Sequence, residues 1–125
     1  MVATSLDAER SYGDQFTART VHETKRQKVV CGYFEPGQFI PVHAPDSDVA
    51  ITVLEGEGVV RDGAREHEVE PGDVVAVPAG ENRGVRATGG WLEATLVTAP
   101  PPTDAEHEPV REGLRKGEFE PQGGS

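Results

Sequence analysis

Residues 37–60 read GQFIPVHAPDSDVAITVLEGEGVV, and this stretch decides the fold. Its first part, 39–43, is extended, because the residue before Pro41 is kept out of the helical region. That part ends at a single histidine, His43. An apolar strand is predicted over 48–55, and a glycine turn follows it. The stretch therefore predicts two strands joined by a short polar connection.

The same strand pattern continues on both sides of this stretch. Further strands are predicted over 16–23, 28–34, 74–79, 83–88 and 91–99, with a hairpin over 59–70. Gly or Pro turns separate about eight short strands at spacings of about 8 to 12 residues, which is typical of a sandwich or a small barrel. No stretch before residue 100 has a convincing helical period. The sequence therefore predicts an all-β domain.

Composition divides the chain into three parts. Residues 1–15 are polar and predict a flexible N-terminal arm, whereas residues 16–99 carry all of the predicted strands. Residues 100–125 are rich in proline and acidic residues and are expected to form a C-terminal tail. We therefore expect one β-domain with a polar arm and an acidic tail.

The C-terminal tail contains one signal for a short helix. Thr103 is suited to cap it, with Glu106 three residues further on. His107 is expected to lie in solvent. The tail residues that could pack onto the barrel are Val110, Leu114 and Phe119.

The charge of the chain restricts its partners. The net charge is −10, from 22 acidic and 12 basic residues among 125. Because a negative surface repels phosphate, neither nucleic acid nor an anionic membrane is an expected partner. A surface rich in acids and poor in lysine suits a salt-rich cytoplasm. Two interpretations stay open: a halophilic source, or simply an acidic and soluble protein.

Cysteine usage and apolar runs bear on localisation. Cys31 is the single cysteine, so no internal disulfide can form, which fits a reducing cytosol. We expect its thiol to act as a small buried hydrophobic group rather than as a nucleophile. The first residues show no secretory signal, and the longest apolar run, 74–79, is too short to span a membrane. We therefore expect a cytoplasmic protein.

Five residues separate Gly37 from His43, and a strand ending in a glycine turn follows them. This arrangement resembles the first motif of the cupin family, which comprises small β-barrels of the jelly-roll class. That motif is Gly, five residues, His, one residue, His, three or four residues, Glu, six residues, Gly. Here Pro45 stands in place of the second histidine, and Val49 or Ala50 stands in place of the glutamate.

Five residues also separate Gly72 from Pro78, which resembles the second motif of the same family. That motif is Gly, five residues, Pro, four residues, His, three residues, Asn. Arg83 stands in place of its histidine, and Ala87 stands in place of its asparagine. The resemblance covers about residues 25–99 and implies a single-domain, all-β, cupin-like jelly-roll barrel.

The resemblance also implies which metal ligands this chain lacks. In the metal-binding members, three histidines and a glutamate at these positions hold Fe, Mn, Ni or Zn, and a site needs three or four protein ligands. Only His43 remains, and Arg83 would bring a fixed positive charge into the same pocket. We therefore expect no metal cofactor. If one divalent metal is bound, His43 would need Asp48 or Glu81 as a further ligand.

A pocket that contains Arg83 and His43 would instead suit an anion. A guanidinium binds a carboxylate through two parallel hydrogen bonds, and His43 could add a donor near neutral pH. Tyr33 and Trp91 could line the same pocket, or pack in the core or at a dimer interface. Two alternatives stay open: Arg83 points to solvent or pairs with a glutamate, and His43 is hydrogen-bonded within its strand.

These observations favour a cupin that binds a small, anionic molecule without a metal, or that has a sensing or scaffold role. The first alternative is a metal-dependent cupin enzyme, of the dioxygenase or isomerase type, with His43 as one ligand. The second is a structural homodimer without a ligand. Because barrels of this kind pair through edge strands, we expect a homodimer in any case. The sequence leaves open whether any reaction is catalysed.

Overall fold

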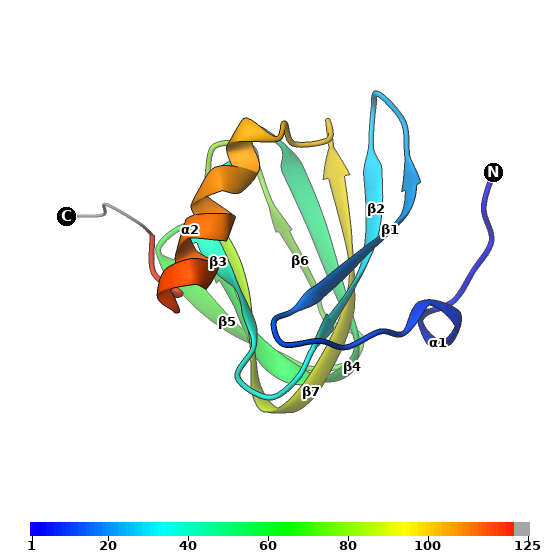
Figure 1. Ribbon diagram of the computed structural model, residues 1–125, viewed down its shortest axis with the longest axis horizontal. Helices are drawn as coiled ribbons and strands as arrows, with labels where there is room; N and C mark the ends of the chain where they lie inside the picture. Colours follow the sequence, from blue (N-terminus) through cyan, green and yellow to red (C-terminus); the bar gives the residue numbers. More distant parts are fainter. Residues whose placement is uncertain (122–125) are drawn as a thin grey trace.

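Seven antiparallel strands form the body of the described part of the chain, residues 1–121 of a computed structural model (Figure 1). The strands are β1 (Thr17–Glu23), β2 (Lys28–Phe34), β3 (Phe39–His43), β4 (Asp48–Asp62), β5 (Arg65–Val69), β6 (Val74–Val77) and β7 (Arg83–Ala99). The helices are α1 (Leu6–Glu9), the 3₁₀ helix η1 (Ala105–His107) and α2 (Glu108–Lys116). Within residues 1–121, no helix is both long and apolar enough to cross a membrane.

Strands β4 and β7 hold the barrel together, because each pairs with several others. The strand order is β1-β2-β7-β4-β5, with β3 also paired to β7 and β6 also paired to β4. β7 pairs with β3 through its first half and with β2 through its second half, so it bends from one partner to the other. These antiparallel pairings confirm the predicted all-β, jelly-roll barrel.

Two predicted strand breaks are wrong. The chain does not turn back at residues 56–58 or at Gly89 and Gly90; it continues there as the bent strands β4 and β7. Both strands shift register against each other next to Gly56, which has a φ of 78°. A glycine can mark a turn, but it can also mark a bulge where two backbones approach closely. Here the second meaning applies, because a Cβ at Gly56 would lie 1.7 Å from the carbonyl oxygen of Trp91.

The core is made mostly of valine, as the low aromatic content requires. Its buried members are Phe34, Val49, Ile51, Val53, Val60, Val69, Val77, Val85, Ala87, Leu92 and Ala94. β-branched side chains suit this position because they pack well on a pleated surface. Cys31 is also buried, and burial raises the pKa of its thiol, as expected for a small hydrophobic group.

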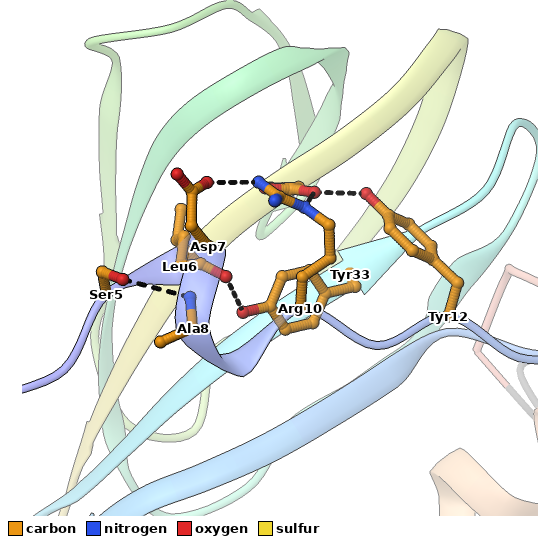
Figure 2. A network of polar contacts seen from close by, with 8 residues as sticks. Ser5, Leu6, Asp7, Ala8, Arg10, Tyr12 and Tyr33 are labelled. Atoms are coloured by element: carbon orange, nitrogen blue, oxygen red, sulfur yellow. Dashed lines mark hydrogen bonds and ion pairs between the residues drawn. The ribbon is translucent and has the colours of Figure 1, made fainter.

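The N-terminal arm, expected to be flexible, packs against the barrel. It contains α1, in which the Oγ of Ser5 accepts a hydrogen bond from the backbone N–H of Ala8 at 3.1 Å. Figure 2 shows the hydroxyl of Tyr33 donating to the carbonyl oxygen of Leu6, at 2.7 Å. The buried Tyr33 therefore ties α1 to the side of β2.

A buried carboxylate fixes the next part of the arm. Glu93 on β7 is only 4% exposed. It accepts hydrogen bonds from the Nε of Arg10 at 2.6 Å and from Nη2 of the same side chain at 2.7 Å. The hydroxyl of Tyr12 donates to Glu93 as well, so Arg10 and Tyr12 bind the same carboxylate. The hydrogen bonds from Arg10 lower the pKa of Glu93, although burial opposes that shift.

Replacement of Glu93 by glutamine is expected to lower the free energy of unfolding by about 1–3 kcal/mol at neutral pH. Because the folded-state pKa of Glu93 is depressed, its contribution is complete above the ordinary glutamate pKa of about 4.3 and is lost as the pH falls through the folded value. The stability of Glu93→Gln should therefore fall less steeply than that of the wild type below about pH 5. Urea denaturation at several pH values measures both effects.

The control for this comparison is Glu55→Gln, because Glu55 is an exposed carboxylate opposite Glu93 in the β4–β7 register. Its stability should stay within about 0.5 kcal/mol of the wild type. Equal losses in the two variants would contradict a specific role for Glu93.

The C-terminal tail folds back over the barrel through the predicted cap. The N–H of Glu106 donates to the Oγ1 of Thr103 at 3.3 Å, and the N–H of Thr103 donates to Glu106 Oε1 at 2.9 Å. Glu106 also accepts a hydrogen bond from the backbone N–H of Asp46, at 2.6 Å. The cap therefore also anchors the tail to the connection between β3 and β4.

Helix α2 covers β3, on the opposite side of the barrel from α1 in Figure 1. The close contact is possible because Gly113 has no side chain: a Cβ there would lie 2.5 Å from Pro41. Phe119 is buried, and its carbonyl oxygen accepts a hydrogen bond from the N–H of Val42 at 2.8 Å. The predicted tail packing is confirmed for Phe119, while residues 122–125 of the tail lie outside the described part of the chain.

Candidate ligand-binding site

A cavity of about 150 Å³ is lined by strands β1, β2, β3, β4 and β7 and by the C-terminal tail. Most of its wall is apolar. Its apolar side chains include Val30, Ile40, Val49, Ile51, Val85 and Leu96. Its polar side chains are Lys28, His43, Arg83, Thr98 and His107. Both residues that the motif spacing singled out, His43 and Arg83, therefore line the same cavity.

The register between β3 and β7 explains this meeting. His43 is the last residue of β3 and Arg83 is the first residue of β7, and the two are direct partners across the strands. The spacing of the two motifs therefore places His43 and Arg83 opposite each other on paired strands. The side chains at these two places lie together whether or not they are metal ligands.

Arg83 is a buried cation without an anionic hydrogen-bond partner among the described residues. The residue is 5% exposed, and its Nη2 donates to the carbonyl oxygen of Pro78 at 2.9 Å. Its Nε and Nη1 atoms are buried and have no hydrogen-bond partner. Burial lowers the pKa of the guanidinium, and the nearby carboxylates of Asp48 and Glu106 oppose that shift. Glu93 forms its ion pair with Arg10 and not with Arg83.

His43 is held in one tautomer by its own strand. Its Nδ1 lies 2.8 Å from the carbonyl oxygen of Pro41. A carbonyl oxygen can only accept, so Nδ1 carries the proton. Burial lowers the pKa of His43, the hydrogen bond to Pro41 opposes that shift, and the charge of Arg83 adds to the lowering. The lowered pKa favours the neutral ring, in which Nε2 carries a lone pair.

His107 does not lie in solvent, contrary to expectation. The tail brings it over the cavity, together with Pro102 and Val110. Burial lowers the pKa of His107, followed by the charges of Lys28 and Arg111. The capping signal at Thr103 predicted the helix but carries no information about the surface on which that helix rests.

Tyr33 and Trp91 do not line this cavity. Tyr33 is fully buried under α1, whereas Trp91 is 52% exposed and packs edge-on against Tyr12, with ring centroids 4.6 Å apart. Trp91 borders an open surface depression of about 760 Å³ near Arg10 and Glu93. Arg10 and Glu93 are already paired with each other there, and Glu55 and Glu57 add only negative charge, so its larger volume does not indicate an anion site.

The residues of the barrel do not fit the metal that the fold suggests. Among residues 1–121, no three His, Cys, Asp or Glu side chains cluster closely enough to hold a metal ion. Asp48 uses one carboxylate oxygen to accept the backbone N–H of Ala79, at 2.9 Å, and Glu81 is exposed. His67 contacts Asp62 on the hairpin, outside the cavity. Arg83, the cross-strand partner of His43, brings a guanidinium, which has no lone pair to offer a metal.

The fold is a jelly-roll barrel with a cavity, and sequence comparison gives its family. The sequence model described as "Cupin domain" matches residues 32–99, so the chain belongs to the cupin family. The comparison with curated proteins found no match.

Three solved structures illustrate the likeness. The protein TT1209 from Thermus thermophilus is 32% identical, with a TM-score of 0.78, covering 82% of this chain and 100% of that one. An RmlC-like cupin protein from Desulfovibrio desulfuricans is 33% identical, with a TM-score of 0.69, covering 81% and 97%. An uncharacterized conserved protein with a double-stranded β-helix domain from Klebsiella pneumoniae is 26% identical, with a TM-score of 0.72, covering 78% and 89%.

Proposed function

We propose that the protein binds a small anion inside the barrel, without a metal ion. The observation that carries this proposal is the pair of unpartnered donors on the buried guanidinium of Arg83. Leaving a buried donor without an acceptor costs about 1–3 kcal/mol, and more when the donor is charged. A carboxylate or another oxyanion beside Arg83 would remove that cost and neutralise the buried charge.

Each of the two motif residues has a distinct role in this proposal. Arg83 supplies the positive charge and at least two free N–H donors. The neutral His43 supplies an acceptor, because its Nδ1–H is engaged with Pro41. The site would therefore suit an anion that also carries a hydroxyl or a shared proton, as well as a simple carboxylate. Binding, sensing or scaffolding is favoured over metal-dependent catalysis because the donor set does not fit a metal.

The proposed function is tested by unfolding the protein in the presence of different salts. Carboxylates and phosphate should be compared with chloride at matched ionic strength. At least one anion is expected to raise the melting temperature in a saturable way; a ligand at 100 times its Kd adds about 2.7 kcal/mol of stability. Metal content is measured on protein purified without chelator. Close to one metal equivalent per chain, or equal melting temperatures in all salts, would contradict the proposal.

A further inference from the structure

Strand register divides the cavity into two layers. Lys28 pairs with Thr98 across β2 and β7, and His43 pairs with Arg83 across β3 and β7. These four residues line the cavity beside Val49, the β4 partner of Thr98, and we call the four polar side chains the polar layer. Since side chains on one face of a strand repeat every second residue, the next layer lies about 7 Å further along the barrel. It contains Val30, Ile40, Ile51, Val85 and Leu96, and we call it the apolar layer.

Most of the buried polar side-chain atoms that lack a hydrogen-bond partner, among the described residues, belong to the polar layer. Four buried side-chain atoms of residues 1–121 have no partner: Nε and Nη1 of Arg83, Oγ1 of Thr98, and Nε of Arg61. The first three belong to side chains of this one layer, while Arg61 lies outside the cavity lining. Native proteins leave few buried polar groups unpaired, so three such atoms among the side chains that line one cavity favour a polar ligand group there.

The apolar layer offers nothing to a second charged group. Its side chains are Val, Ile and Leu, and Ile51 and Val85 are almost fully buried. Burying a charge without a partner is costly, whereas each buried methylene strengthens binding by about fourfold. The cavity therefore favours a molecule with one charged end and one apolar end.

The dimensions of the cavity restrict the length of the apolar end. Its volume is about 150 Å³. That is about half of the smallest pockets that hold drug-sized ligands. An acid with about three to five carbons spans the roughly 7 Å from the polar layer into the apolar layer, whereas a long fatty acid would not fit.

We propose that the ligand is a short-chain monocarboxylate, with its carboxylate between Arg83 and Thr98 and its apolar chain between Ile51 and Leu96. This proposal rests on the anion-binding function proposed above and specifies its ligand class. The carboxylate takes up free N–H groups of Arg83, and the hydroxyl of Thr98 donates to one of its oxygens. The alkyl chain fills the apolar layer. Dicarboxylates are discriminated against because they would place charge in that layer, and inorganic phosphate because it has no apolar part to fill it.

The proposal is tested with titration calorimetry on the wild-type protein, using a series of sodium carboxylates. Formate, acetate, propionate, butyrate, valerate and octanoate are compared with succinate and phosphate. Affinity should rise by about fourfold per methylene up to about four or five carbons, and octanoate should bind more weakly than butyrate. Tighter binding of succinate or phosphate than of butyrate would overturn the ligand class but leave anion binding intact. No binding of any anion would overturn both.

Two conservative variants locate the two ends of the ligand. Thr98→Val removes only the unpartnered hydroxyl, so the fold should be kept while the affinity for every carboxylate falls by about three- to tenfold. Ile51→Val enlarges the apolar layer by one methylene and should shift the preferred acid one carbon longer. The control is Val53→Ala, since Val53 lies two residues further along β4, on the same face as Ile51, and is buried outside the cavity lining. An unchanged optimum in Ile51→Val, or an equal shift in Val53→Ala, would place the alkyl chain elsewhere.

Discussion

Replacement of Arg83 by methionine should weaken carboxylate binding by at least about 100-fold, equivalent to about 3 kcal/mol. It should also raise the free energy of unfolding of the ligand-free protein by about 1–3 kcal/mol. The two effects have one cause. A buried cation with unpartnered donors destabilises the empty barrel, and methionine fills similar space with no charge to desolvate. Calorimetric titration with butyrate and urea denaturation without ligand measure the two effects separately.

Arg86→Met is the matched control for this variant. Arg86 lies on the same strand, but its guanidinium stacks over the ring of Phe119, 4.8 Å from the centroid, and it does not line the cavity. Its replacement should leave carboxylate affinity unchanged and cost about 0.5–1 kcal/mol of stability. Butyrate affinity within about threefold of wild type in Arg83→Met would contradict the anion site. A ligand-free Arg83→Met protein that is less stable than the wild type would contradict the destabilisation assigned to the buried charge of Arg83.

The sequence predicted the barrel and half of the proposed site for the same physical reason. Motif spacing encodes strand register, and the register of β3 against β7 brings His43 and Arg83 together. Glycine and proline turns likewise predicted most strand ends, because few other residues adopt the required backbone angles. Local sequence pattern was therefore sufficient to predict features that depend on the pairing of neighbouring strands.

Other parts of the site depend on contacts between distant segments, and no local pattern carries them. The tail places His107 over the cavity through the bond between Glu106 and the backbone of Asp46. Thr98 shares a face of β7 with Leu96, and only the finished barrel shows that its hydroxyl is buried and unpartnered. Tyr33 was misplaced for a similar reason, since its partner Leu6 lies in an arm that has no strand pattern.

Replacement of Gly56 by alanine is expected to destabilise the protein by about 3–5 kcal/mol or to prevent folding. Two costs add at this position. The backbone has a φ of 78°, which disfavours any side chain, and the new Cβ would lie 1.7 Å from the carbonyl oxygen of Trp91. The clash is with the backbone of β7, so no rotamer change relieves it. Urea denaturation, with the soluble yield as a second measurement, tests the expectation.

Two other glycines separate the costs of φ and of crowding. Gly72 has a φ of 98° but no atom within 4 Å of a built Cβ, so Gly72→Ala should cost only about 1–2 kcal/mol. Gly90 has open space around its built Cβ and no positive φ, so Gly90→Ala should be neutral or slightly stabilising. Equal losses in Gly56→Ala and Gly72→Ala would show that backbone angle alone determines the first position. A larger loss in Gly56→Ala than in Gly72→Ala would instead support close backbone contact between β4 and β7 at Gly56. At that contact the two strands bend, where the sequence had predicted a turn, and the bend closes the barrel around its cavity.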